Sequence, residues 1–254
     1  MSRTLEYAYD DFALSVLAKA LGHADDRTAF VRRAQNYRNV IDPRTGWAQG
    51  RHSDGTFLDD DNVSVKTPFI TEGAPCHYSW YVPHDPDGLM ECMGGRERYV
   101  QKLDSMFSNQ YYWHGNEPCH QVAYMYNYAG EPWKTQKTVR RILDTEYKET
   151  PSGLAGNDDA GQMSAWYIFS AMGFYPVCPG TTRYELASPT FDKVVVSLEN
   201  GRQFCIKVEN ASPENIYVQE ITRNGEPYTA TYIDHEDIVN GATFRFRMGA
   251  TRKR

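Results

Sequence analysis

Long apolar runs, basic blocks and paired-cysteine motifs are all missing from this 254-residue sequence. Its apolar runs are too short for a membrane-spanning helix, and its first residues contain no hydrophobic signal-peptide core. Lys and Arg number 27 against 33 Asp and Glu, so the net charge is −6. An acidic chain without a basic cluster is a poor candidate for nucleic-acid binding. We therefore expect no transmembrane segment, no targeting signal in this chain and no nucleic-acid partner.

The cysteines are few and scattered. There are 5 of them, an odd number, and none stands in a C-x-x-C pair. This pattern argues against a zinc ribbon and against a dense disulfide framework. The sequence also lacks an H-E-x-x-H zinc motif, a Gly-Lys-Ser/Thr phosphate-binding loop and a G-x-S-x-G nucleophile elbow.

Aromatic residues are plentiful by contrast, with 18 Tyr, 11 Phe and 5 Trp. Many of them will fill a core. An excess of Tyr and Trp is also typical of sugar-binding clefts, because an aromatic face stacks on a pyranose while the polar tip bonds hydroxyl groups. Composition alone gives only a mild indication of carbohydrate binding.

Periodicity divides the chain into a helical domain, residues 1–178, and a small antiparallel β domain, residues 179–254. Helical spacing, with glycine and proline at the ends, predicts helices at 6–21, 25–40, 96–107, 120–128, 132–147 and 159–172. The last helix is apolar on nearly all sides, which predicts deep burial. Alternating patterns predict strands at 183–187, 193–198, 203–209, 216–223, 228–233 and 243–248, with an Asn-Gly hairpin turn at 224–225.

Glu72 is the first candidate for chemistry, in an irregular stretch rich in Gly, Pro and aromatic residues. It is a single carboxylate near Phe69, Tyr78, Trp80 and Tyr81 in the sequence. Apolar surroundings raise the pKa of a carboxyl group, as a general acid requires. The alternative interpretation is an exposed glutamate beside a glycine turn.

Asn116 and Glu117 form the second candidate, just before Pro118. Amide and carboxylate oxygens are hard ligands that suit Ca²⁺ better than zinc. Alternatively, both residues cap the helix that follows.

Asp158 and Asp159 form the third candidate, at the start of the predicted apolar helix. A helix N-terminus favours the anionic form of an acid, which a general base needs. Capping by Asp159, with Gln162 as its capping-box partner, explains one of the two acids but not both. One protonated and one ionised acid together match the requirement for glycoside hydrolysis.

Several motifs, in the same order, resemble the C-terminal part of glycoside hydrolase family 92. They are S-R-T-L-E-Y-A-Y-D-D at 2–11, T-E-G at 71–73, P-H-D at 83–85, G-N-E-P-C-H at 115–120, G-N-D-D at 156–159, G-Q-M-S-A-W-Y at 161–167 and G-F-Y-P at 173–176. The resemblance covers nearly the whole chain. It implies an exo-acting α-mannosidase that requires Ca²⁺, inverts the anomeric configuration and releases terminal mannose from α-mannosides or N-glycans.

By this resemblance, Glu72 is the general acid and the Asp158/Asp159 pair holds the base, with Asp159 preferred. The metal ligands are Asn116, Glu117 and Asp159. The resemblance also implies that the sugar subsites are lined by His77, Tyr78, Trp80, His84, Trp113 and His114.

The resemblance further implies a fold class and a missing part. We expect an α+β chain in which a partial (α/α)₆ barrel precedes a β-sandwich-like domain, without the family's N-terminal β-sandwich domain. That domain is then the expected partner, and the parent enzyme is expected to be secreted, periplasmic or on the bacterial cell surface. His114-Gly115 stands where α-1,2-specific members have His-Glu, so α-1,3, α-1,4 and α-1,6 linkages stay open. A non-catalytic carbohydrate-binding module and an inactive truncated fragment are the alternatives.

Overall fold

The computed structural model describes residues 1–59 and 62–253 and divides the chain into two compact units. The amino-terminal unit comprises Met1–Val122 with Pro179–Thr181, and the carboxyl-terminal unit comprises Ala123–Cys178 with Thr182–Arg254. This division differs from the predicted boundary between residues 178 and 179. The reason is packing, because Phe169 and Met172 of a helix lie against the core of the sheets that follow.

The amino-terminal unit contains helices joined by irregular loops. They are α1 (Ser2–Leu21), α2 (Ala24–Arg33), the 3₁₀ helix η1 (Ala34–Asn39), α3 (Pro75–Tyr78), α4 (Pro86–Cys92), α5 (Arg96–Ser108) and the 3₁₀ helix η2 (Glu117–Cys119). The 3₁₀ helix η3 (Val122–Tyr124) begins at the end of this unit. The predicted helix at 25–40 is wrong in its second half, which is a 3₁₀ segment.

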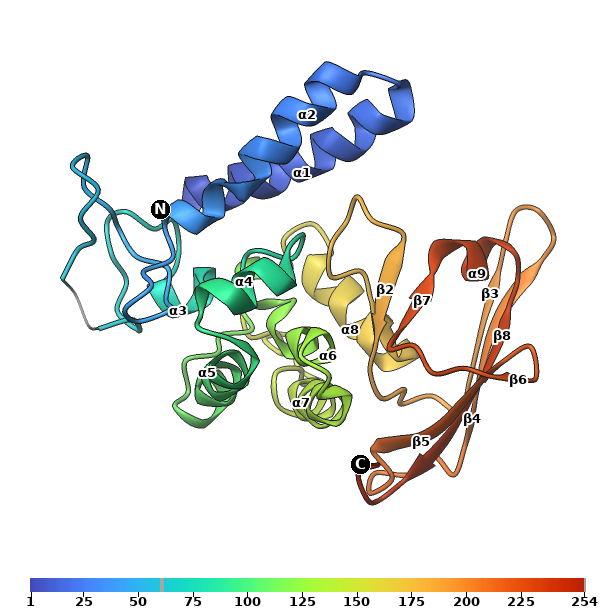
Figure 1. The fold of residues 1–254 in the computed structure, drawn as a ribbon. Coiled ribbons are helices and arrows are strands. Elements are labelled where there is room, and N and C mark those ends of the chain that lie inside the picture. The colour runs from blue at the N-terminus through green and yellow to red at the C-terminus, as the bar shows by residue number, and fades with distance from the viewer. Residues whose placement is uncertain (60–61, 254) are drawn as a thin grey trace. The chain divides into compact units, whose positions relative to one another are not determined.

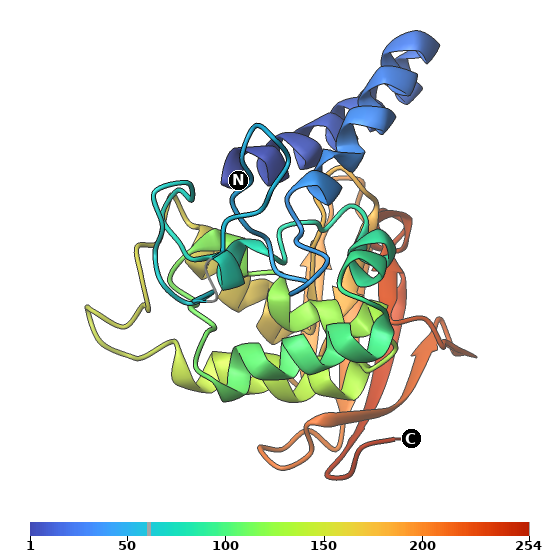
Figure 2. The same cartoon turned by 60° about the vertical axis from the view of Figure 1, so that its left-hand side comes forward.

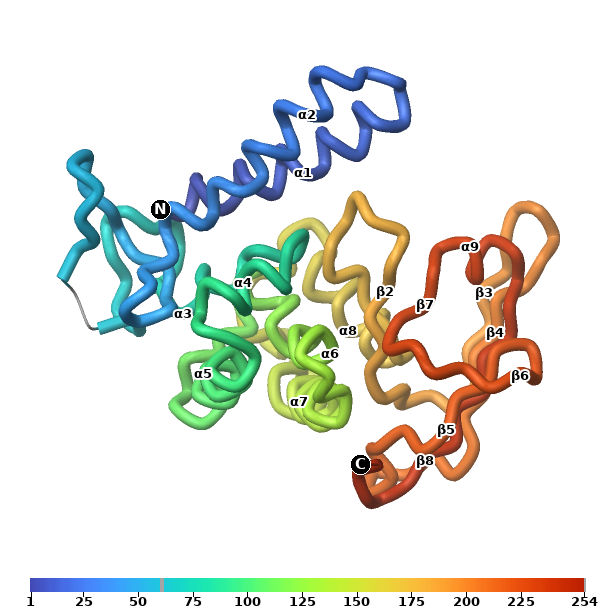
Figure 3. Tube along the Cα trace, in the orientation of Figure 1, coloured from blue at the N-terminus to red at the C-terminus, as the bar shows by residue number. Residues whose placement is uncertain are grey.

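Helices α1 and α2 lie side by side as an antiparallel hairpin, and Figure 3 follows the chain through the turn between them. Gly22 ends α1 with φ of 76°, a left-handed conformation that glycine adopts without steric cost. The carboxylate of Asp11, buried on α1, receives two hydrogen bonds of 3.0 Å from the Arg33 guanidinium. This bidentate pair fixes the register of the hairpin.

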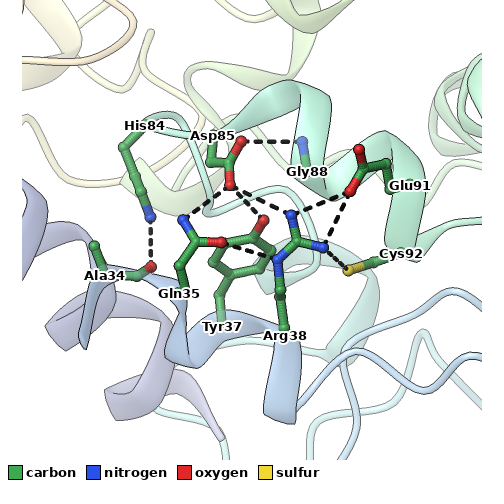
Figure 4. A network of polar contacts seen from close by, with 9 residues as sticks. All are labelled: Ala34, Gln35, Tyr37, Arg38, His84, Asp85, Gly88, Glu91 and Cys92. Atoms are coloured by element: carbon green, nitrogen blue, oxygen red, sulfur yellow. Dashed lines mark hydrogen bonds and ion pairs between the residues drawn. The ribbon is translucent and has the colours of Figure 1, made fainter. Parts of the chain in front are cut away.

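Asp85 connects η1 to α4 through a polar network (Figure 4). Its Oδ2 accepts hydrogen bonds from the Tyr37 hydroxyl at 2.6 Å and from Gln35 Nε2 at 3.1 Å. Its Oδ1 caps α4 by accepting from the Gly88 amide at 3.0 Å. Burial alone would raise the pKa of Asp85, but these hydrogen bonds and the Arg38 charge outweigh it and lower the pKa.

The carboxyl-terminal unit places helices beside two sheets. Its helices are α6 (Met125–Tyr128), α7 (Pro132–Thr145), α8 (Gln162–Met172) and α9 (His235–Val239). One sheet has the order β1 (Phe174–Tyr175), β2 (Arg183–Leu186), β7 (Tyr232–Asp234). The other, twisted in Figures 1 and 2, has the order β3 (Lys193–Ser197), β4 (Gln203–Glu209), β8 (Thr243–Gly249), β5 (Tyr217–Arg223), β6 (Glu226–Pro227).

The expectation of mixed helix and sheet is confirmed, and most predicted strands lie within a residue of the observed ones. The prediction of purely antiparallel pairing is wrong, because β4 and β8 run parallel. The predicted strand at 228–233 is also wrong in extent, since only 232–234 is a strand and α9 follows it. The Asn-Gly turn is confirmed, with φ of 53° at Asn224 and 94° at Gly225 between paired Arg223 and Glu226.

Helix α8 is less buried than its composition predicts. Met163, Trp166, Ser170 and Ala171 are buried, but Ile168 is half exposed. The prediction of burial on all sides is therefore wrong for this chain. Within the part of the chain that the structure describes, no helix combines the length and apolar character needed to span a membrane.

Asp85→Asn is expected to reduce the free energy of unfolding by about 2 kcal/mol at pH 7, because hydrogen bonds to a charged group are lost. Since the pKa of Asp85 is lowered in the folded state, its stabilisation is fully present above the unfolded-state pKa of about 3.9. It is lost as the pH falls from there through the lower folded-state pKa. Urea unfolding at pH 7 and near pH 3 measures both effects. The exposed Asp87→Asn serves as control. If the difference in free energy of unfolding between wild type and Asp85→Asn is the same at pH 3 as at pH 7, the charge of Asp85 does not contribute to stability.

Candidate active site

Glu72 lies in a turn just before α3, with φ of 56°. A left-handed conformation costs a residue other than glycine about 1–2 kcal/mol, so its surroundings must hold it there. The Glu72 side chain is exposed, and its carboxylate accepts no hydrogen bond from the described residues. The predicted apolar walls around this carboxylate are therefore absent from the described chain, and that part of the prediction is wrong.

Three hydrogen bonds within the amino-terminal unit restrain the turn that contains Glu72. Ser2 Oγ accepts from the Thr71 amide at 3.1 Å, and His77 Nδ1 accepts from the Ala74 amide at 3.1 Å. Asn116 Nδ2 donates to the Glu72 carbonyl oxygen at 2.8 Å. No local pattern predicted the Ser2 and Asn116 contacts, because these residues are far from Glu72 along the chain.

His77 is held in one neutral tautomer. Because Nδ1 accepts from Ala74, Nε2 carries the proton and donates to the Tyr111 carbonyl oxygen at 2.9 Å. Burial lowers the pKa of His77, against an opposing effect of the Tyr111 carbonyl. The ring centroid lies 6.1 Å from that of Trp113, whose side chain is 43% exposed. Of the predicted sugar-contacting aromatic residues, Trp113 is the one with an open face.

Three other predicted sugar contacts are core residues. Trp80 is 0% exposed and packs edge-to-face on Trp47 and Tyr99. Tyr78 is 3% exposed, and its hydroxyl donates to Glu6 at 3.3 Å. Side chains buried to this degree cannot stack on a sugar, so the prediction of direct contact is wrong for Tyr78 and Trp80 in this structure.

His114 is the third of these, at 1% exposed. Its Nδ1 lies 2.6 Å from the Tyr112 hydroxyl, and its carbonyl oxygen lies 3.0 Å from His120 Nε2. Burial, followed by the nearby charge of His120, lowers the pKa of His114 to about 3. His114 is thus a neutral core histidine, and its predicted contact with sugar is also wrong here.

His84 is partly buried, and its side chain contacts the Ala34 backbone (Figure 4). Its ring stacks on Tyr9 and Phe12, with centroids 6.0 and 5.5 Å apart. Its Nε2 donates to the Ala34 carbonyl oxygen at 3.0 Å, and Nδ1 has no hydrogen-bond partner among the described residues. Burial lowers the pKa of His84. These contacts explain its position without a sugar, and its predicted sugar contact stays a prediction.

Asn116 and Glu117 open the 3₁₀ helix η2. The capping alternative is not what the side chains do, because no side chain caps η2 and the Asn116 amide reaches Glu72 instead. The Asn116 and Glu117 side chains offer only oxygen donors for a metal, which fits the preference of Ca²⁺. Two residues cannot complete its shell of six to eight oxygens, and no group of three or more His, Cys, Asp or Glu among the described residues could hold a metal ion.

Asp158 and Asp159 have different environments. Asp158 Oδ1 accepts from the Ser164 amide at 3.0 Å and from the Ser164 hydroxyl at 2.8 Å, so it satisfies the first turn of α8. The predicted capping box of Asp159 and Gln162 is wrong, since α8 begins at Gln162 after Gly161 and Gln162 donates to Tyr175.

The Asp159 side chain is exposed, on a residue with φ of 48°, and its carboxylate has no hydrogen-bond partner among the described residues. Glu72 and Asp159 are therefore two exposed carboxylates, each on a left-handed residue. Strained backbone of this kind is enriched at active sites. Carboxyl groups are among the side chains that donate or accept protons in hydrolytic reactions.

Comparison with known proteins identifies a family for this chain. Residues 1–250 match the glycosyl hydrolase family 92 catalytic domain. A family 92 α-mannosidase from Bacteroides thetaiotaomicron has 43% identity and a TM-score of 0.94, over 99% of this chain and 34% of its own. A family 92 inverting mannosidase from the same organism has 34% identity and a TM-score of 0.93, over 99% and 37%. An uncharacterised secreted glycosidase of Arthroderma benhamiae is 30% identical over 98% of this chain and 35% of its own.

The chain thus spans about a third of the length of the relatives it matches. Because the family match extends over nearly all of its residues, the chain belongs to glycosyl hydrolase family 92.

Proposed function

We propose that this chain carries the catalytic carboxylates of an exo-α-mannosidase that hydrolyses terminal α-mannosides, including those of N-glycans, with inversion. The observation that carries the proposal concerns Glu72 and Asp159. Both carboxylates are exposed on left-handed residues, and neither has a hydrogen-bond partner within residues 1–59 and 62–253. Membership of a glycoside hydrolase family and similarity to solved α-mannosidases support it.

In the proposed reaction, Glu72 gives its proton to the glycosidic oxygen as the bond from that oxygen to the anomeric carbon breaks. A water molecule attacks the anomeric carbon from the opposite face, and Asp159 takes a proton from that water. One bond forms and one breaks, which inverts the configuration. Because attack and departure occur in one step, no covalent sugar–enzyme intermediate forms.

Asp158 is proposed to position its neighbour. Its hydrogen bonds to Ser164 fix it to α8, and the Asp159 side chain is left free of the helix terminus. This division of roles favours Asp159 as the base and gives both acids a function.

We also propose that the activity requires Ca²⁺. A bound Ca²⁺ would contact sugar hydroxyl groups and supply positive charge near the reacting ring. Asn116 Oδ1 and the Glu117 carboxylate would hold it, with Asp159 of the carboxyl-terminal unit as the third predicted ligand. Oxygen-only donor chemistry supports this assignment.

The rest of the catalytic protein is proposed to lie outside this chain. Since the chain spans about a third of its relatives' length, we propose that it forms part of an (α/α)₆ barrel and works with the family's N-terminal β-sandwich domain. We further propose that the parent enzyme is exported, as the name of the Arthroderma relative says of that protein. Trp113 is the side chain we favour for sugar contact, because it is 43% exposed. His77 lies beside it, and its predicted sugar contact would use the ring rather than the two hydrogen-bonded nitrogens.

Mannose release from linkage-defined α-mannobiosides tests the catalytic roles. Glu72→Gln and Asp159→Asn are each expected to lower the rate by about 10²- to 10⁴-fold, because each removes a proton-transfer group. An activated aryl α-mannoside separates the two roles. Its leaving group needs no proton, so it should be largely spared by Glu72→Gln but not by Asp159→Asn.

The control for these variants is the exposed Glu97→Gln, which should behave as wild type. Mannose release by Glu72→Gln at the wild-type rate on every substrate would contradict the acid role of Glu72. No release by the wild type, together with sugar binding that Glu72→Gln leaves intact, would point instead to a carbohydrate-binding module. The preferred mannobioside also identifies the linkage, with weak α-1,2 cleavage expected from His114-Gly115.

Calcium binding is tested separately from catalysis by thermal or urea unfolding. A ligand at 100 times its dissociation constant raises the free energy of unfolding by about 2.7 kcal/mol, and this gain should vanish with a chelator. Glu117→Gln is expected to weaken the gain, whereas Glu97→Gln should keep it. Identical unfolding of wild type with calcium and with chelator would argue against a metal site in this chain.

A further inference from the structure

The Asn116 side chain has two ends with different environments. Its Nδ2 donates to the Glu72 carbonyl oxygen at 2.8 Å, and this orientation is required, because a carbonyl oxygen can only accept. Its Oδ1 has no hydrogen-bond partner among the described residues. The Asn116 backbone is itself fixed, since its carbonyl oxygen accepts from the Cys119 amide at 3.1 Å as η2 begins.

The Glu72 peptide depends on this one contact. The bonds from Thr71 to Ser2 and from Ala74 to His77 hold the residues on either side. Among the described residues, one hydrogen bond reaches a backbone atom of Glu72, and the Asn116 side-chain amide donates it. The residue that most needs support, because its φ is 56°, therefore receives it from a side chain of the adjacent loop.

We propose that Asn116 is a positioning residue that couples a cation at its Oδ1 to the backbone conformation of Glu72. This inference rests on the proposed function and deepens it. The oxygen and nitrogen of an amide share one conjugated carbon, so a cation on Oδ1 withdraws electron density from Nδ2 and makes its N–H a stronger donor. Occupation of the metal site then stiffens the turn that carries the proposed acid.

Asn116→Asp separates the two ends of this side chain. Aspartate has the same shape and keeps oxygen ligands for Ca²⁺, but an ionised carboxylate cannot donate to the Glu72 carbonyl. Asn116→Ala removes both ends. Asn36→Asp is the matched control, because it adds the same charge at an exposed position whose Oδ1 only accepts, from Asn39.

The measurements are Ca²⁺ affinity by titration calorimetry and amide hydrogen exchange of the 70–78 segment, with calcium and with chelator. In chelator, Asn116→Asp and Asn116→Ala should exchange about fivefold faster than wild type at Ala74, from loss of one hydrogen bond. Calcium should slow this exchange in wild type and in Asn36→Asp. Asn116→Asp should bind calcium without slowing it, and Asn116→Ala should bind calcium weakly.

Calcium-induced protection that persists in Asn116→Asp would overturn the coupling, since a pure ligand role predicts that result. Equal exchange rates of wild type and both variants in chelator would show that the hydrogen bond from Asn116 to the Glu72 carbonyl does not restrain the turn. If wild type does not bind calcium, the proposed metal requirement and the coupling are both overturned. The exchange rates in chelator would still show whether the Asn116 hydrogen bond restrains the Glu72 turn. Faster exchange across α5 as well would show general unfolding rather than a local effect, and would also count against the proposal.

Discussion

Both candidate acids depend on a backbone constraint, the left-handed conformation of Glu72 in one unit and of Asp159 in the other. Such a residue relaxes to a right-handed or extended conformation unless its neighbours prevent it. At Glu72 the restraint comes from Asn116, with Ser2 and His77 on either side. At Asp159 it comes from the start of α8, where the Asp159 carbonyl oxygen accepts from the Gln162 amide at 3.3 Å. Both carboxylates therefore point from short turns whose conformation other residues determine.

The aromatic richness of the chain is explained mainly by packing rather than by sugar binding. Among the tryptophans, Trp80 and Trp166 are fully buried, Trp47 and Trp133 are partly buried, and Trp113 is exposed. Composition cannot separate these roles, because the same rings that stack on a pyranose also fill a core. The histidines behave similarly, since His114 and His84 are held by rings and backbone carbonyl groups. Only side chains that keep an open face can take part in recognition.

Local sequence signals predicted the elements well and the contacts between them poorly. Helix α5, strand β4 and the Asn224-Gly225 turn lie where periodicity and turn chemistry predicted, because each depends on neighbouring residues. The parallel pairing of β4 with β8 was missed, because strand patterns do not encode partner direction. The candidate acids were identified from the sequence, but the cap that Asp158 makes with Ser164 was assigned to Asp159. Asn116 was chosen for its oxygen, while its contact with Glu72 joins loops that no local pattern relates.

In the proposed mechanism, the two adjacent aspartates at the start of α8 have different roles, one structural and one chemical. Backbone carbonyl groups accept from three of the four amides that open α8, and the Asp158 carboxylate accepts from the remaining one, that of Ser164. If Asp159 made that cap instead, its carboxylate would be tied to backbone amides and would be a weaker base. Because Asp158 satisfies the terminus, Asp159 can remain exposed on its left-handed residue. This division supports the proposed assignment of Asp159, rather than Asp158, as the base.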